Sequence, residues 1–484
     1  MTKGDGHRPE HELVRLTSGD ARRHARLVVP RHARGAQDTR SEARRDRDRI
    51  LYSVAWRRLG GVTQVVTPFE DMALMHNRLT HSEKVVQVAR SIAERLLHDK
   101  PARELVVRLG GIDADVVEAA ALAHDLGHPP FGHIGEITLD KVARGLLRLP
   151  DGFEGNAQTF RTVLIGETRS NDYHGLNLTC ATLVAIAKYP WQRDPTLKDD
   201  HRAKLRNDAN YRRRWRKFSV YRSEKAAFDE AREFLDDIEG FLPDTQSLEA
   251  SIMDVADDIT YAIHDLEDFY LAGILDVRAV LDELRLDEDD GLLRKLRDRL
   301  GIDYPDYFSE DLFAKAVRVV KDELKASFSA KNDGGVQTVG RARSAGSKLI
   351  GKYINSVEIS DDVFWKHGPY IALDAEAWHE VQLLKEITKN FVIKRPDIAL
   401  LQRGQQRILR ELVKYLLRWK NSNADFKRLP RRLRDEITTY APSGGNTNRC
   451  ILDYLCTLTD GQCYALYYKL SGSRPAASPM DLFL

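Results

Sequence analysis

Apolar residues recur at helical spacing along most of the chain, with polar residues between them. One run has apolar side chains at Val85, Val88, Ile92 and Leu96, positions three or four apart that share one face of a helix. The same pattern returns over residues 113–124, 246–271, 276–300, 375–420 and 449–469. Strand-like alternation is scarce, and no strand–helix–strand rhythm indicates a parallel sheet. The pattern predicts an all-α fold.

The hydrophobic pattern also divides the chain into three parts. Residues 1–45 are rich in Arg and poor in large apolar residues, which predicts a weakly ordered or partner-dependent arm. Helical periodicity continues over residues 46–470, where we expect one helical body with a core of about 50–275 and a C-terminal part of about 276–470. Residues 471–484 have the composition of a tail.

Composition narrows the class of protein. The 484 residues carry 75 Lys and Arg against 73 Asp and Glu, a formal net charge of +2, which argues against a dedicated polyanion binder. The longest apolar stretches, such as residues 116–123, are far shorter than the ~20 residues of a membrane span. Residues 1–14 lack the apolar region of a secretory signal, and the four widely spaced cysteines predict core thiols. We therefore expect a cytoplasmic protein without a membrane partner.

A dense group of chemically active side chains follows the apolar run 116–123. It consists of His124, Asp125, His128, His133 and Glu136. Burying an imidazole beside a carboxylate is costly without a partner. A divalent cation is such a partner, since His and Asp both ligate Mn, Fe, Zn or Co. An isolated His-Asp pair occurs by chance, so that pair alone indicates little.

Two other segments supply matching groups. His81 lies at the start of the helical run that contains Val85. Asp257, Tyr261 and Asp265 are four residues apart, which places them on one face of a helix. Taken singly, His81 would be a capping residue and the aspartates a solvated face. Together with residues 124–136, they have the order of a metal-ligand set.

In this order, the motifs resemble those of the HD-domain metal-dependent phosphohydrolases, and within them the deoxynucleoside triphosphate triphosphohydrolases typified by bacterial dGTPases. The resemblance extends from about residue 45 to about residue 468 and includes the segments 49–53, 77–82, 123–136, 152–158, 175–179, 188–191 and 256–261. It implies an all-α HD-domain phosphohydrolase fold with helical additions.

The resemblance also implies a metal centre and a reaction. It places one divalent ion (Mn, Mg, Fe or Co) on His81, His124, Asp125 and Asp257. The implied reaction is attack of water on the α-phosphorus of a dNTP, which releases the deoxynucleoside and intact tripolyphosphate. The residue types suit this chemistry, because such an ion lowers the pKa of a bound water and polarises a phosphate oxygen. By motif position, His133 and Glu136 are the catalytic pair, since an unperturbed His titrates near neutrality and can protonate the leaving 5′-oxygen.

Five residues match positions that contact substrate in the family: Gln64, Arg78, His128, Tyr261 and Asp265. Gln64 matches a residue near the 3′ edge of the sugar, and Arg78 matches a phosphate contact. Tyr261 would pack beneath the sugar and leave no room for a 2′-hydroxyl, while Asp265 would accept from the 3′-hydroxyl. His128 matches either a phosphate neighbour or a structural group. For Arg78, Tyr261 and Asp265, the alternative is an ordinary surface or half-buried helix position.

One position departs from the family pattern. Some relatives have a catalytic His where this chain has Gly155, so that group is missing here. The Phe-Glu-Gly-Asn form of residues 153–156 also occurs in the branch typified by the bacterial dGTPases. In that branch the matches to His133 and Glu136 carry the proton chemistry.

Several partners and functions stay open. The basic cluster 212–217, with Tyr211 and Trp215, would suit single-stranded DNA, to which some family members respond, but a solvated loop is the favoured interpretation. The resemblance favours a dNTP triphosphohydrolase with a preference for dGTP, assembled as a homo-oligomer, often a hexamer. The alternatives are another HD-superfamily phosphodiesterase or nucleotidase, and a nucleotide- or DNA-binding regulator whose site only senses.

Overall fold

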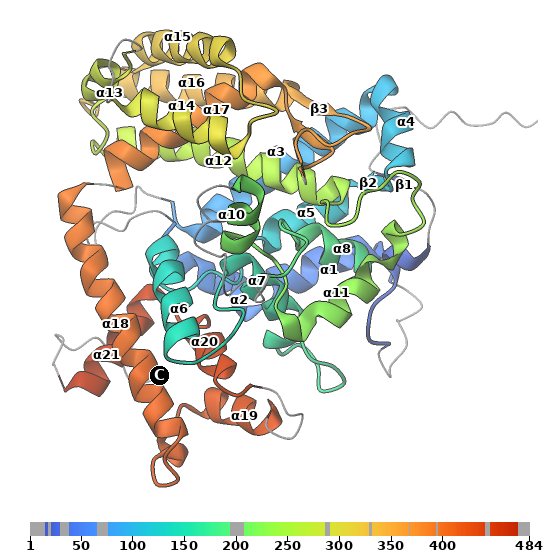
Figure 1. The fold of residues 1–484 in the computed structure, drawn as a ribbon, viewed down its shortest axis with the longest axis vertical. Coiled ribbons are helices and arrows are strands. Elements are labelled where there is room, and N and C mark those ends of the chain that lie inside the picture. The colour runs from blue at the N-terminus through green and yellow to red at the C-terminus, as the bar shows by residue number, and fades with distance from the viewer. Residues whose placement is uncertain are drawn as a thin grey trace, which may run out of the picture.

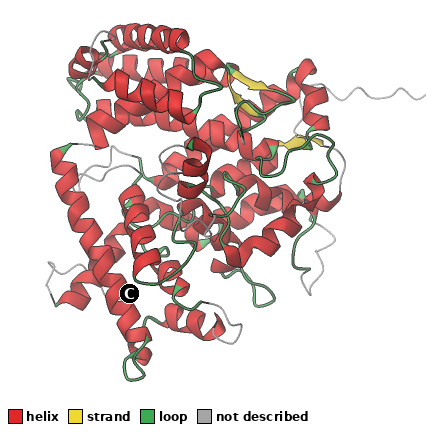
Figure 2. Ribbon diagram, viewed as in Figure 1, coloured by secondary structure: helices red, strands yellow, loops and turns green. Residues whose placement is uncertain are grey.

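The computed structural model describes residues 15–17, 21–29, 38–64, 76–193, 208–285, 291–328, 332–366, 368–393, 395–440 and 446–472. Over these ranges the fold is built almost entirely from helices, with two small sheets (Figure 2). The predicted all-α fold is confirmed. No helix within these ranges combines the length and the apolar character needed to cross a membrane.

The first half of the chain supplies the helices that surround the candidate site. They are α1 (Glu42–Leu51), α2 (Val54–Arg58), α3 (Arg78–His98), α4 (Lys100–Arg108), α5 (Ala114–Ala123), α6 (Gly132–Gly145), α7 (Gly155–Arg161), α8 (Cys180–Ile186), α10 (Ala209–Arg216), α11 (Lys225–Arg232) and α12 (Leu248–Leu271). Helices α3, α5 and α12 pack against one another at the centre of the molecule (Figure 1).

The second half adds helices on two sides of this centre (Figure 1). They are α13 (Val277–Glu283), α14 (Leu292–Asp303), α15 (Glu310–Ser327), α16 (Val336–Asn355), α17 (Ala375–Thr388), α18 (Pro396–Lys420), α19 (Arg431–Tyr440), α20 (Arg449–Leu455) and α21 (Asp460–Ser471). Strands β3 (Val357–Ile359) and β4 (Ile371–Leu373) form an antiparallel pair in which Val357 lies opposite Leu373.

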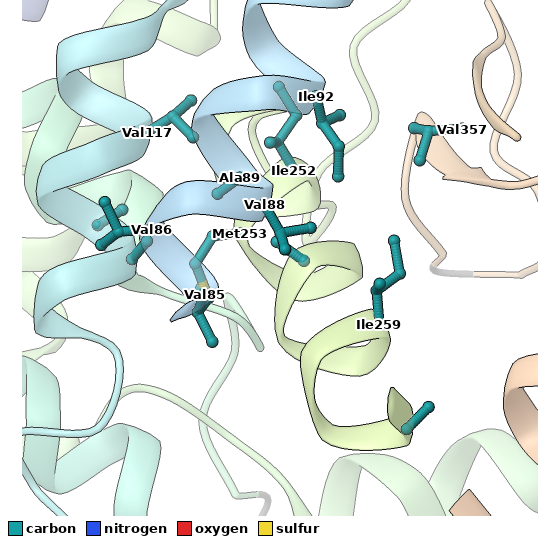
Figure 3. Close-up of a cluster of buried hydrophobic side chains, with 14 of the residues drawn as sticks. Val85, Val86, Val88, Ala89, Ile92, Val117, Ile252, Met253, Ile259 and Val357 are labelled. Carbon is teal, nitrogen blue, oxygen red and sulfur yellow. The ribbon is translucent and has the colours of Figure 1, made fainter. Parts of the chain in front are cut away.

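The main hydrophobic core lies between α3, α5 and α12. Val85 and Ile92 of α3 are fully buried, as are Val117 of α5 and Ile252 of α12 (Figure 3). The apolar positions of α3 recur every three or four residues, so they line one side of the helix. This packing fixes α3 and α12 side by side, and both helices carry candidate ligands.

A second, smaller core joins α6 to the C-terminal helices. Leu139 and Val142 of α6 pack with Leu409 and Leu412 of α18, and buried residues of α19, α20 and α21 complete the cluster. Packing therefore connects α6, from the first half of the chain, to residues beyond 400. Hydrophobic periodicity gives no indication of this connection.

The described parts of the N-terminal segment pack onto the body, and residues 1–14, 18–20 and 30–37 of the predicted arm lie outside the described residues. Strand β1 (Arg15–Thr17) pairs antiparallel with β2 (Gly111–Asp113). Arg23 is buried, forms an ion pair with Glu249 of α12 and donates a hydrogen bond to the carbonyl of Gly110 at 2.9 Å. Composition alone did not indicate this ion pair, because it does not reveal which carboxylates are buried beside an arginine.

Replacing Arg23 with Met is expected to lower the free energy of unfolding by about 3–5 kcal/mol, because the Glu249 carboxylate would stay buried without its cation. Urea denaturation followed by circular dichroism would measure the change. Arg22→Met is the matched control: Arg22 pairs with the exposed Asp237, and exposed pairs contribute at most about 1 kcal/mol. Equal effects of the two substitutions would contradict the prediction.

Candidate active site

The candidate site is built around the turn that follows α5. His124 caps the C-terminal end of α5, and its Nδ1 lies 2.7 Å from the carbonyl oxygen of Ala121. Nδ1 therefore carries the proton that this carbonyl accepts, which leaves Nε2 with its lone pair. Within the described part of the chain, Nε2 of His124 is buried and has no hydrogen-bond partner. A second-sphere bond of this kind is the usual way to orient a metal-binding imidazole.

Close backbone packing holds this turn in place. A Cβ at Gly127 would lie 2.0 Å from the backbone nitrogen of Thr159, so only glycine fits where α7 approaches. The Thr159 hydroxyl accepts from the Gly127 amide at 2.9 Å and donates to the His124 carbonyl at 3.0 Å. The buried Arg58 donates to the carbonyls of Leu126 and His128 at 3.0 and 2.7 Å. The geometry of the turn is thus fixed from both sides.

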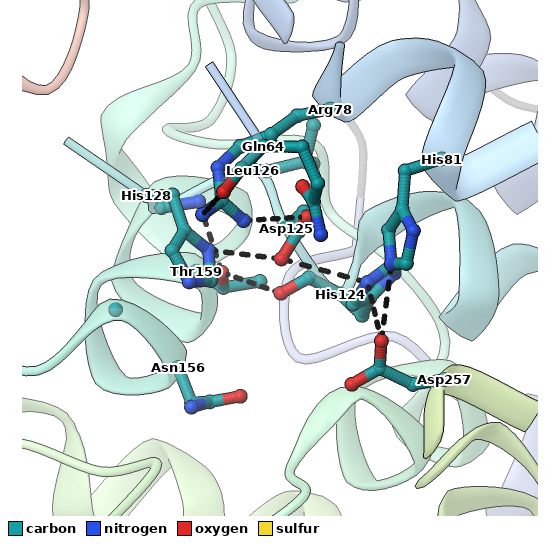
Figure 4. A network of polar contacts seen from close by, with 12 residues as sticks. Gln64, Arg78, His81, His124, Asp125, Leu126, His128, Asn156, Thr159 and Asp257 are labelled. Atoms are coloured by element: carbon teal, nitrogen blue, oxygen red, sulfur yellow. Dashed lines mark hydrogen bonds and ion pairs between the residues drawn. The ribbon is translucent and has the colours of Figure 1, made fainter. Parts of the chain in front are cut away.

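Helices α3 and α12 bring two further ligand candidates to His124. The Asn77–Thr80 capping box starts α3 and places His81 on its buried face. Nε2 of His81 lies 3.1 Å from Oδ1 of Asp257, and Nε2 of His124 lies 3.8 Å from the same oxygen (Figure 4). One ligand atom from each of these three residues falls within 4.8 Å of the others.

Asp125 adjoins this group. Its Oδ1 lies 3.5 Å from Nε2 of His124, and its Oδ2 accepts from Arg78 at 2.7 Å (Figure 4). The structure thus groups three of the four predicted ligands, His81, His124 and Asp257, and places Asp125 next to His124.

The protonation states of these residues suit a divalent cation. Burial lowers the pKa of His81. Burial alone would raise the pKa of Asp257, but the Lys188 charge and the hydrogen bond from His81 hold it well below its usual range. The Arg78 and His124 charges likewise hold the pKa of Asp125 well below its usual range against the effect of burial. A neutral imidazole and two ionised carboxylates are the forms that bind a metal, so the residues fit the implied ion.

Lys188 is a contributor that sequence reasoning missed. Its ammonium group donates to Oδ2 of Asp257 at 2.8 Å and lies 2.6 Å from Oδ1 of Asp254. Lys188 directly follows the fully buried end of α8, and a lysine in a buried run is a sequence feature that indicates a partner carboxylate. Its motif was noted, but nothing in the local pattern identified Asp257 as the partner.

The predicted catalytic pair lies at the start of α6 and is connected to Asp125 through His128, whose Nε2 lies 3.8 Å from Oε1 of Glu136. Nδ1 of His133 lies 3.1 Å from Oε2 of Glu136, and the Gly155 amide donates to Oε1 of Glu136 at 3.0 Å. Burial would raise the pKa of Glu136, but the charges of Lys217 and His128 and the bond to His133 hold it well below its usual range. His133 itself is largely exposed, with 72% of its side chain accessible.

Gly155 has a physical role at this point. A Cβ there would lie 2.5 Å from Oε1 of Glu136, so the glycine makes room for the Glu136 carboxylate. At the position where some relatives carry a histidine, this chain has Gly155, whose amide contacts Glu136.

The structure places His128 next to Asp125 and Asp265 next to His81. Nδ1 of His128 lies 2.9 Å from Oδ1 of Asp125. The Oε1 atom of Gln64 is buried without a hydrogen-bond partner among the residues described. Tyr261 is half-buried, and burial together with the Asp265 and Asp257 charges raises its pKa. Asp265 is fully buried, one turn further along α12 than Tyr261.

His76 is a second residue that sequence reasoning missed. Its Nε2 lies 2.8 Å from Oδ1 of Asp265, and its Nδ1 contacts Oδ2 of Asp268. Burial would lower the pKa of His76, but these two carboxylates raise it to about 9. Its ring stacks on that of His81 with a centroid distance of 5.8 Å.

A cavity of about 260 Å³, here called the basic cavity, lies beside Lys188, and Asp254 and Asp258 also line it. Its cationic lining residues are Lys188, Arg213, Lys217 and Lys385. Two of these belong to the 212–217 cluster, whose other members include Arg212, paired with Asp303 at 2.7 Å, and Arg214, paired with Asp244 at 3.0 Å. Part of the cluster therefore faces a cavity beside the site.

Comparison with known proteins agrees with this geometry. The HD domain model matches residues 78–262, and the phosphohydrolase-associated domain model matches residues 371–469. The deoxyguanosinetriphosphate triphosphohydrolase-like protein of Streptomyces coelicolor is 32% identical over 450 residues, which cover 90% of this chain and 93% of the relative. The chain belongs to this dGTPase-like family. Proteins of the same name from Corynebacterium efficiens, 33% identical over 77% of this chain and 79% of the relative, and Bifidobacterium longum, 30% identical over 89% and 82%, are also similar.

Family membership fits the site that the helices build. HD domains of dGTPase-like proteins bind divalent metals, and residues 78–262 of this member contain His81, His124 and Asp257. The predicted membership in the HD superfamily is confirmed, and the homologues support a hydrolase.

Divalent metal is expected to stabilise this dGTPase-like protein against heat. A ligand at 100 times its dissociation constant adds about 2.7 kcal/mol to the stability of the folded state, so Mn²⁺ should raise the Tm by several degrees and EDTA should reverse the rise. Scanning calorimetry would measure the shift. The matched variant is His124→Gln, which should lose most of the rise. An equal rise in that variant would contradict the assignment of His124.

Proposed function

We propose that the protein hydrolyses deoxynucleoside triphosphates at the α-phosphorus, releasing the deoxynucleoside and tripolyphosphate. The observation that carries this proposal is the chain of contacts that connects the His133–Glu136 pair, through His128 and Asp125, to the group formed by His81, His124 and Asp257. That group, with Asp125, would hold one divalent ion. When bound, the ion would lower the pKa of a water ligand and polarise an α-phosphate oxygen.

The chain supplies a proton for the leaving group. In the proposed reaction His133 donates from Nε2 to the departing 5′-oxygen, while Glu136 holds Nδ1 at 3.1 Å. An ionised Glu136 fixes the tautomer and orientation of the ring, and the fixed Gly155 amide keeps Glu136 in place. Such general acid catalysis contributes roughly 100- to 10,000-fold to a rate.

Residues of α12 would select deoxyribose over ribose. Tyr261 would pack against C2′ of the sugar, where a 2′-hydroxyl would collide with its ring. The fully buried Asp265 would accept from the 3′-hydroxyl, because a buried carboxylate that expects a donor disfavours substrates that lack one. Gln64 would contact the same edge of the sugar.

The basic cavity suits the polyphosphate. Lys188, Lys217 and Lys385 line it, and Arg78 lies 2.7 Å from Asp125. Cations around a phosphate chain bind it and stabilise the charge that develops on it. His128 would complete the surroundings of the α-phosphate.

The preferred substrate, oligomeric state, location, effector and metal ion are inferred from the resemblance and from the names of the relatives. The names of these relatives refer to deoxyguanosine triphosphate, so we expect dGTP to be the preferred substrate. We also expect a homo-oligomer, in the form of a hexamer, and a cytoplasmic location. Single-stranded DNA stays a candidate effector, and Mn, Mg, Fe and Co stay candidate ions.

Product analysis tests the function. The purified protein would be incubated with each dNTP and with GTP, in Mn²⁺ or Mg²⁺, and the products separated by ion-exchange chromatography. We expect deoxynucleoside and intact tripolyphosphate, fastest from dGTP and slowest from GTP. Orthophosphate or pyrophosphate would instead indicate another HD-superfamily activity. Binding without turnover, with and without single-stranded DNA, would indicate a sensor.

A further inference from the structure

His76 connects the start of α3 to two carboxylates of α12. Its Nε2 lies 2.8 Å from Oδ1 of Asp265, and its Nδ1 contacts Oδ2 of Asp268. The backbone amide of His76 also donates to Oδ2 of Asp268 at 3.2 Å. Asp268 therefore anchors both the main chain and the ring of His76, and the ring in turn reaches Asp265.

Asp265 has few other constraints. It is fully buried, and among the described residues its carboxylate forms an ion pair with His76 alone. Neither of its oxygens has a well-aligned hydrogen bond from any residue that the structure describes. Burying a carboxylate without a hydrogen-bond donor costs free energy. The Asp265 oxygens are therefore available to accept a hydrogen bond from a ligand.

We propose that His76 is a positioning residue that holds the Asp265 carboxylate in the orientation that accepts a hydrogen bond from the substrate 3′-hydroxyl. This inference rests on the proposed function and adds to it the residue that sets the sugar contact. With Oδ1 held beside His76, Oδ2 is left as the acceptor for the hydroxyl. Without His76, the carboxylate could rotate or admit water, and a substrate lacking the 3′-hydroxyl would lose its disadvantage.

A different set of three side chains, which includes His76 and Asp265, allows a competing interpretation. Ligand atoms of His76, His81 and Asp265 also lie within 4.8 Å of one another, so His76 could instead ligate a second ion. The contact between Nδ1 of His76 and Asp268 is compatible with both interpretations, because a second-sphere carboxylate also orients a metal-binding imidazole. The metal content of the protein separates the two interpretations.

The test compares dGTP with 2′,3′-dideoxy-GTP, which lacks the 3′-hydroxyl. The wild-type protein should favour dGTP in kcat/KM, and His76→Ala should reduce this preference roughly tenfold or more. His76→Gln, which keeps an N–H donor toward Asp265, should restore part of the preference. A purely structural role would lower both rates equally and leave their ratio unchanged.

Further variants keep the test decisive. If His76→Ala does not fold, Asp268→Asn removes the charge that anchors His76 and should shift the ratio in the same direction by a smaller factor. The control His98→Ala alters an exposed residue at the other end of α3 and should leave the ratio unchanged.

Three outcomes would overturn the inference in different ways. An unchanged ratio in both His76→Ala and Asp268→Asn would refute the positioning role alone. Two ions per chain in the wild type, falling to one in His76→Ala, would show that His76 is a metal ligand. Failure of the wild type to hydrolyse any dNTP would refute the proposed function, and the inference with it.

Discussion

Replacing Asp257 with Ala is expected to remove bound divalent metal and catalytic turnover together. Oδ1 of Asp257 lies close to both imidazoles, at 3.1 Å from Nε2 of His81 and 3.8 Å from Nε2 of His124. The substitution also removes one of the two carboxylates that pair with Lys188. Lewis-acid assistance contributes several kcal/mol to catalysis, so the rate should fall roughly a thousandfold or more. Metal analysis by mass spectrometry and a dGTP assay would measure both losses.

Asp254→Ala provides the matched control for this prediction. Asp254 lies on α12, three residues before Asp257, and binds the same Lys188 at 2.6 Å. It lies outside the group of potential ligand atoms, so its variant should retain metal and lose far less activity. The opposite pattern, with metal lost in Asp254→Ala and retained in Asp257→Ala, would mean that the ligand register on α12 is wrong.

The sequence predicted the helices that carry the site because their burial is periodic. Val85 and Ile92 mark the buried face of α3, and His81 continues that face toward the start of the helix. The spacing of Asp257, Tyr261 and Asp265 likewise placed them on one side of α12. Local patterns of this kind depend on a single helix, so they can be read without knowing its neighbours.

Contacts between elements distant in the sequence were not predictable in the same way. The bonds of Lys188 to Asp257, of His76 to Asp265 and of Arg23 to Glu249 each join different helices or loops. Which cation neutralises which carboxylate depends on tertiary packing. The sequence identified residues able to bind a metal or transfer a proton, and the fold determined their partners.

Replacing His133 with Ala is expected to reduce dGTP turnover roughly 100- to 10,000-fold while leaving metal content unchanged. His133 lies on α6, and its side chain is 72% exposed, so its removal creates no cavity in either core. Nδ1 is held by Glu136, which leaves Nε2 to donate the proton. Glu136→Gln should lower the rate in the same direction, because the amide orients the ring less strongly than a carboxylate. Loss of metal in His133→Ala would contradict this assignment.

The nature of the leaving group separates proton donation from substrate binding. An alkoxide leaving at the 5′-oxygen needs a proton as the bond to phosphorus breaks, whereas p-nitrophenolate is stable enough to leave without one. If His133 is the general acid, His133→Ala should lower kcat far more with dGTP than with p-nitrophenyl triphosphate. Both kcat and KM would be measured with each substrate. If His133 instead binds the phosphates, both substrates should be slowed equally and KM should rise for each. The difference between the two rate losses therefore measures the contribution of the transferred proton, because the triphosphate and the metal ligands are common to both reactions.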